Sequence, residues 1–251
     1  MRLRQQLLTK NDCYKAGRTI QVKGVMVHST GANNPKVCRY VPGDGEMGLN
    51  TADNHWDRPD LTKCVHAFVG KFADGGVGTV QTLPWSHRGW HAGGAANNTH
   101  IGFEICEDGL ENPVYFAQVY QEAAELTAML CRQYGLDPLE DGVVICHQEG
   151  FRRGVASNHA DVLHWFPKMG KPMDDFRAEV ARLMKGEDDV TYEQWKEFME
   201  QYRQELGQQP APDWGQKELE QAKELGLTDG SRPQDLATRQ EVASMIIRAK
   251  A

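Results

Sequence analysis

The sequence predicts an α/β domain followed by a small helical module, and three observations favour this class. Short and almost wholly apolar runs, such as 24–27 and 143–146, are typical of strands that are buried on both faces of a sheet. The longer segment 114–134 carries apolar residues at helical spacing. Gly, Asp or Pro bounds these segments, which indicates turns between them.

Each element follows from its own local pattern. The run 20–27 predicts a strand that ends at His28, because Gly31 to Pro35 breaks it. Gly135 and Asp137-Pro138 end the helix expected at 114–134, and a closing helix is expected at 173–184. Further strands are expected at 65–69, 77–83, 101–106 and 143–146.

Three regions follow along the 251 residues: a main domain at 1–185, a helical connector and linker at 186–212, and a helical module at 213–251. A charged helix is expected at 192–206, and short helices at 217–225 and 238–249. Thr238 and Glu241 form a capping box at the start of the last one. About 40 residues bury little core alone, so we expect the module to pack on the main domain or on copies of itself.

Composition excludes several classes of function. The net charge of -7 argues against nucleic acid as a partner, since phosphates call for a basic face. No apolar run approaches the roughly 20 residues that span a bilayer. The first ten residues lack the apolar segment of a signal peptide, which predicts a cytoplasmic protein. Six scattered cysteines form no CxxC pair, so we expect free and mostly buried thiols, although three disulfides are the alternative.

Two histidines follow buried strands: His28 after the first and His147 after the last. Neighbouring strands that end on one sheet edge can bring both side chains to one metal, with Asp161 as a third ligand. Imidazole and carboxylate are ligands that zinc prefers in catalytic sites. Glu104, a carboxylate in an apolar strand, is the candidate proton acceptor, and His159 could donate to an oxyanion. Taken singly, each of these residues has an ordinary structural interpretation; the combination indicates a zinc hydrolase.

In this combination the chain resembles the zinc-dependent N-acetylmuramoyl-L-alanine amidases of the type-2 amidase and peptidoglycan-recognition-protein family. The similarity runs from about Val22 to Val180. The motifs that carry it are Val27-His28-Ser29-Thr30, Trp90-His91-Ala92-Gly93, Ile101-Gly102-Phe103-Glu104-Ile105-Cys106, His147 and His159-Ala160-Asp161.

The resemblance implies a central mixed β-sheet flanked by helices. It implies Zn²⁺ on His28, His147 and Asp161, catalysis by Glu104 and His159, and a substrate groove lined by His66, Trp90 and His91. Trp90 as a simple core residue is an equal alternative. Asp161 stands where many members have cysteine, and Val162 stands where they have proline. The long interval after His147 leaves both His159 and Asp161 open as the third ligand.

The implied activity is hydrolysis of the amide between N-acetylmuramic acid and L-alanine of peptidoglycan. It is typical of a bacteriolytic prophage endolysin or an autolysin that stays cytoplasmic until it is released to the wall. The alternatives are a non-catalytic recognition module and a zinc peptidase that acts on stem peptides.

The last segment resembles one S-layer-homology repeat, through Gly226-Leu227-Thr228-Asp229-Gly230 and Thr238-Arg239-Gln240-Glu241. The resemblance implies binding to cell-wall polysaccharide. A helical hairpin for self-association is the alternative.

Overall fold

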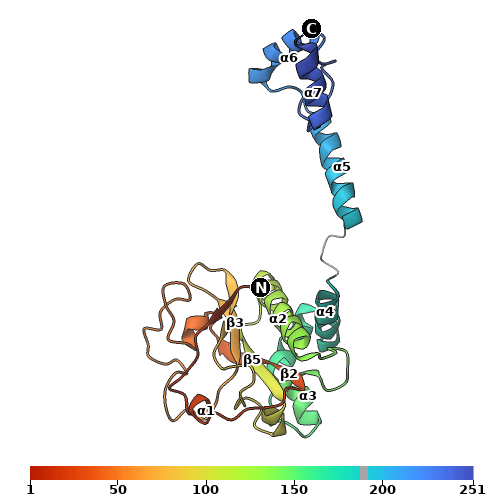
Figure 1. Ribbon diagram of the computed structural model, residues 1–251. Coiled ribbons are helices and arrows are strands. Elements are labelled where there is room, and N and C mark those ends of the chain that lie inside the picture. The colour runs from red at the N-terminus through yellow and green to blue at the C-terminus, as the bar shows by residue number, and fades with distance from the viewer. Residues whose placement is uncertain (187–191, 251) are drawn as a thin grey trace. The chain divides into compact units, whose positions relative to one another are not determined.

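The computed structural model describes residues 1–186 and 192–250, which form two compact units divided at Glu187–Asp188. The first unit holds a six-stranded sheet in the order β1-β4-β3-β5-β2-β6 (Figure 1). The strands are β1 (Leu3–Gln5), β2 (Gly24–Asn33), β3 (Ala67–Lys71), β4 (Val77–Gln81), β5 (His100–Glu107) and β6 (Val144–Cys146). The sheet is mixed, because only the β3–β4 pair is antiparallel. The expected fold class is confirmed.

Helices cover one face of this sheet. The long helix α2 (Pro113–Tyr134) begins at Asn112, whose side chain accepts from two backbone N–H groups, and ends at Gly135 in the left-handed conformation. It packs beside α4 (Met173–Lys185), as Figure 1 shows. The main core lies between these helices and the sheet. Its large and fully buried side chains include Phe103, Ile105, Tyr115, Trp165, Phe166 and Phe176.

The opposite face carries loops, short helices and a second apolar cluster. Tyr40, Trp56 and Phe68 form its aromatic centre, with the rings of Tyr40 and Phe68 stacked at 4.6 Å between centroids. The short helices of the first unit are α1 (Asp12–Lys15) and α3 (His147–Arg152), together with the 3₁₀ turns Val37–Arg39, Ala95–Asn98, Asp161–His164 and Phe166–Met169. This second face carries the site described below.

Two expectations about the first unit need correction. Cys13 and Cys64 form a disulfide, so these two thiols are not free; the fold brings together residues 51 apart in sequence, which no short cysteine spacing can reveal. Cys38, Cys106, Cys131 and Cys146 are free. Strand β2 also continues to Asn33, because its pairing with β5 resumes after an irregularity beyond Ser29, so His28 lies within the strand instead of at its end.

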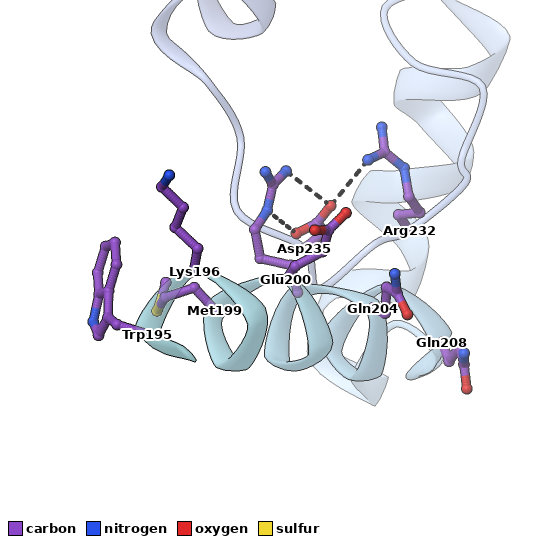
Figure 2. Close-up of a pocket in the computed structure, with 10 residues that line it drawn as sticks. Trp195, Lys196, Met199, Glu200, Gln204, Gln208, Arg232 and Asp235 are labelled. Carbon is purple, nitrogen blue, oxygen red and sulfur yellow. Dashed lines mark hydrogen bonds and ion pairs between the residues drawn. The ribbon is translucent and has the colours of Figure 1, made fainter. Parts of the chain in front are cut away.

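The second unit is helical, with α5 (Tyr192–Gln208), α6 (Gln216–Glu224) and α7 (Arg239–Arg248). The expected capping box of Thr238 and Glu241 is present at α7. A pocket of about 710 Å³ lies along α5 (Figure 2). Arg203 and Arg232, which line this pocket, both pair with Asp235, at 3.2 and 3.0 Å. None of the three helices has a buried residue. Among the described residues of the chain, no helix is long and apolar enough to cross a membrane.

Candidate metal centre and active site

The alternation of strand residues places His28 and Glu104 on one face of the sheet. In β2, Val25 and Val27 point into the core beneath the helices, so Met26 and His28 point to the opposite face. In β5, Phe103 and Ile105 belong to the helix-covered core in the same way. Because β2 and β5 are parallel neighbours with His28 directly opposite Glu104, the two polar side chains emerge side by side.

His147 and Asp161 reach the same place from the other side of β2. Strand β6 pairs with β2 so that Cys146 is opposite Val27, and His147 follows as the first residue of α3, level with His28. Asp161 opens the 3₁₀ turn 161–164 and has a φ of 42°, a conformation that costs free energy for a residue with a side chain. Strain of this kind persists where the surroundings hold the residue in place.

One atom from each of these three side chains meets at a common point. Asp161 Oδ2 lies 2.8 Å from His28 Nδ1 and 2.9 Å from His147 Nδ1, and the two histidine atoms are 3.1 Å apart. His28 and His147 are buried, and Asp161 is 14% exposed. Two imidazole nitrogens and one carboxylate oxygen this close repel one another unless a proton or a cation lies between them.

The donor set of this cluster fits zinc. Two histidines and one carboxylate form a known catalytic zinc set, which leaves a position open for water. Among the residues that the structure describes, His28, His147 and Asp161 are the group whose ligand atoms lie close enough to share a metal ion. His28, His147 and Asp161 would hold the ion, and it would supply a Lewis acid at this point of the sheet.

The protonation states of Asp161 and His28 favour the binding of a cation. Burial disfavours the charged form of Asp161, yet its contacts with the rings of His147 and His28 outweigh burial and leave the pKa of the carboxyl below its ordinary value. Burial lowers the pKa of His28, partly opposed by Asp161. The carboxylate is therefore ionised and His28 neutral at pH 7, as metal ligation requires.

Glu104 lies at the edge of this cluster, and its carboxyl group has an unusual environment. Its Oε2 is buried and has no hydrogen-bond partner among the described residues. Burial raises the pKa of Glu104 well above its ordinary value, and the nearby carboxylate of Asp161 adds to the effect. A carboxyl group with a raised pKa is a stronger base when ionised, so it is better suited to take up and return a proton than an ordinary glutamate.

His159 lies beside the cluster, exposed to solvent. Its ring is 4.7 Å from that of His147, and its Nδ1 is 3.1 Å from Ser157 Oγ. When Nδ1 accepts the Ser157 proton, Nε2 of the neutral ring is a free donor. Asp161, and not His159, has its ligand atom within the cluster.

A cavity of about 520 Å³ opens over these side chains. It is lined by the three candidate ligands and by Glu104, His159, Trp90 and His91. His66 is not among the lining residues. It is fully buried, with Nε2 2.9 Å from the carbonyl of His87 and Nδ1 accepting from the N–H of Gly102, and burial lowers its pKa to about 4. The expectation that His66 lines the groove is therefore wrong.

The cavity wall also contains residues that the sequence did not predict as site residues. Arg39, Tyr40, Trp56 and Lys63 line it from the segment between β2 and β3, which lacks any helical or strand periodicity. Lys63 Nζ lies 4.7 Å from the Trp56 ring centroid. Ser157 also lines it, and its only sequence signal is its nearness to His159.

Comparison with known proteins gives this geometry a context. A family model described as N-acetylmuramoyl-L-alanine amidase matches residues 18–163, more than half of the chain. No curated protein matches the chain.

Several solved structures share the fold. The chain is similar to the Staphylococcus aureus hydrolase AmiA in complex with its ligand (TM-score 0.55, 19% identity, 73% of this chain and 83% of that one). It is similar to PlyL (TM-score 0.52, 19% identity, 72% and 97%). It is also similar to the catalytic domain of XlyA (TM-score 0.50, 22% identity, 72% and 99%).

Proposed function

The chain belongs to the N-acetylmuramoyl-L-alanine amidase family, and from this premise we propose that it is a zinc-dependent hydrolase of bacterial peptidoglycan. The bond cleaved is the amide that joins the lactyl group of N-acetylmuramic acid to L-alanine of the stem peptide. One observation carries the proposal: His28, His147 and Asp161 converge within 3.1 Å beside Glu104, whose Oε2 is buried without a hydrogen-bond partner among the described residues.

The residues divide the chemistry between them. Zinc, when bound, polarises the scissile carbonyl and acidifies the attacking water. Glu104 accepts the proton of that water, because its raised pKa matches the task, and then delivers the proton to the departing nitrogen of L-alanine. His159 donates from Nε2 to the developing oxyanion, since its Nδ1 lies against Ser157.

The wall of the cavity suits a glycan with a peptide attached. The partly exposed Trp90 offers an aromatic ring to a sugar, while Arg39 and Lys63 offer cations to the carboxylates of a stem peptide. Arg39 Nη1 donates to the backbone carbonyl oxygen of Asn54 at 2.7 Å, and Lys63 Nζ lies 4.7 Å from the centroid of the Trp56 ring, so the partners that hold these two cations at the cavity wall are a carbonyl and an aromatic ring.

The deciding experiment is digestion of purified Gram-positive peptidoglycan by the wild type and by Glu104→Gln, with mass spectrometry of the fragments and zinc analysis of both proteins. We expect free stem peptides that begin at L-alanine, and their loss in the variant although zinc stays bound. Wall binding with intact linkages would instead identify a recognition module. New termini inside the stem peptide would identify a peptidase.

We propose further that the second unit holds the enzyme on the wall by binding cell-wall polysaccharide, and that the protein acts after release from the cytoplasm. Support comes from the S-layer-like sequence around Gly226-Leu227-Thr228-Asp229-Gly230. Co-sedimentation of the full chain with walls, before and after chemical removal of the polysaccharide, tests this. Equal binding to both would refute the polysaccharide role, and concentration-dependent dimerisation would favour self-association.

A further inference from the structure

The two histidines of the metal centre each use their second ring nitrogen in a hydrogen bond that points away from the cluster. Nε2 of His28 lies 3.0 Å from Nδ1 of His91. Nε2 of His147 lies 3.2 Å from Oγ of Ser157. Both partners are therefore candidates for fixing which nitrogen faces a metal.

The proton positions at His91 follow from its second contact. Nε2 of His91 lies 3.1 Å from the backbone carbonyl oxygen of His100, which can only accept a hydrogen bond. Nε2 of His91 thus carries a proton, and Nδ1 of the neutral ring is an acceptor. His28 must then donate from Nε2, which leaves the lone pair of its Nδ1 directed at Asp161 and His147.

The backbone is shaped to hold the His91 ring in this position. A Cβ atom at Gly102 of β5 would lie 2.4 Å from Cγ of His91, and one at Gly89 would lie 2.6 Å from its Cδ2. The imidazole therefore packs against bare backbone on both sides. Asn97 fixes the main chain as well, because its Oδ1 accepts from the N–H groups of His91 and Ala92 at 2.9 and 2.8 Å.

The same turn reaches the second histidine through Ser157. The backbone N–H of Ser157 donates to the carbonyl oxygen of Ala92 at 2.8 Å, and Ser157 Oγ lies 3.3 Å from that oxygen. A Cβ at Gly93 would lie 2.6 Å from Ser157 Oγ, so glycine is needed there for close approach. Ser157 is thereby held where its oxygen can accept from Nε2 of His147.

We propose that the turn from His91 to Asn97 positions both metal-binding histidines. His91 acts on His28, and Ser157, which the turn holds in place, acts on His147. In both histidines Nδ1 is thereby the atom that faces the metal. This inference rests on the zinc site of the proposed function. His91 is accordingly a positioning residue that acts through His28 and not a substrate contact. Groups that orient ligand histidines typically change metal affinity by 10–100-fold when they are removed.

The test measures zinc binding and needs no turnover. His91→Phe keeps a ring in the cradle but removes the acceptor, so we expect zinc to bind about 10–100-fold more weakly in competition with a chromophoric chelator. His91→Asn restores an acceptor close to the position of Nδ1, so its zinc affinity should recover most of that loss. His100→Asn is the matched control: it changes another buried histidine, whose ring bonds Gly142 and does not touch His28.

A second measurement uses the wild type alone, so it does not depend on variants that fold. Long-range ¹H–¹⁵N spectra of the zinc-loaded, ¹⁵N-histidine-labelled protein should show protons on Nε2 of His28 and His147. Metal on Nε2 of either histidine, or unchanged affinity in His91→Phe, would overturn the inference. If the wild type binds zinc in this way but releases no stem peptide, the proposed function fails and the positioning role stands.

Discussion

Replacement of Gly102 by alanine tests how tightly the metal centre is packed against the sheet. The new methyl carbon would lie 2.4 Å from both Cγ and Nδ1 of His91. The ring cannot swing aside without losing its hydrogen bonds to His28 and to the carbonyl of His100. Gly102→Ala should therefore damage stability and metal binding together.

The size of the effect follows from two opposing contributions. Forcing an extra methyl into a packed site costs about 1–3 kcal/mol. The smaller conformational freedom of alanine in the unfolded chain returns about 0.4–1 kcal/mol. We expect a net loss of about 1–2 kcal/mol in the free energy of unfolding, measured by urea denaturation of the metal-free protein. Zinc affinity should fall in the same variant.

Two other glycines supply the controls. Gly70→Ala overpacks β3, with the new carbon 2.7 Å from the Pro35 carbonyl and 2.8 Å from Cys106 Sγ, so it should cost similar stability but leave zinc affinity unchanged. Gly45 has open space around it, and Gly45→Ala should be neutral or slightly stabilising. A Gly102→Ala protein with wild-type stability and zinc affinity would refute the described placement of the His91 ring.

Three further predictions concern charge and covalent structure. Glu104→Gln should lower turnover by about 10²–10⁴-fold. The metal-free variant should also be more stable than the wild type at pH 7, because the raised pKa of Glu104 in the folded state means that its ionisation costs stability as pH rises. In urea titrations this difference in the free energy of unfolding should vanish near pH 4. Asp161→Asn should destabilise the metal-free protein at pH 7, and the difference should shrink steadily as pH falls below the ordinary pKa of an aspartate, because the depressed pKa of the folded-state Asp161 carboxyl contributes stability that is lost over this range; a gap independent of pH would contradict this. Cys13→Ser should lower the free energy of unfolding by about 2–4 kcal/mol, and the wild type with reductant should match it; no effect of reductant on the wild type would argue against the link to Cys64.

The parts of the fold that local patterns specify could be predicted from the sequence. Helix α2 carries its own start and stop signals at Asn112 and Gly135, and the strands that hold His28 and Glu104 are continuous apolar runs. Strand β1 was missed, because Leu3–Gln5 is short and takes its place only by pairing with β4. The disulfide was missed because a contact between residues 51 apart leaves no trace in local spacing.

In the candidate site, too, some features could be predicted from local sequence patterns and others depend on the folded backbone. The sequence predicts His28, His147 and Asp161 as ligands, with His159 the alternative to Asp161, and the first three converge because strand alternation and motif order are sequence properties. The sequence could not predict which way the rings of His66 and His91 point. The His66 ring is buried against the carbonyl of His87, whereas the His91 ring contacts His28. That difference depends on where Gly89 and Gly102 leave room for a ring, which only the folded backbone decides.

The metal centre joins segments that are far apart along the chain: 133 residues separate His28 from Asp161. A metal held by such segments cross-links the whole first unit, so its binding free energy is added to that of folding. At free zinc a thousandfold above the dissociation constant, this amounts to about 4.1 kcal/mol. The supply of zinc would therefore govern the resistance of the protein to proteases as well as its activity. Removal of the metal from the unmutated protein should shorten its lifetime in the presence of a protease.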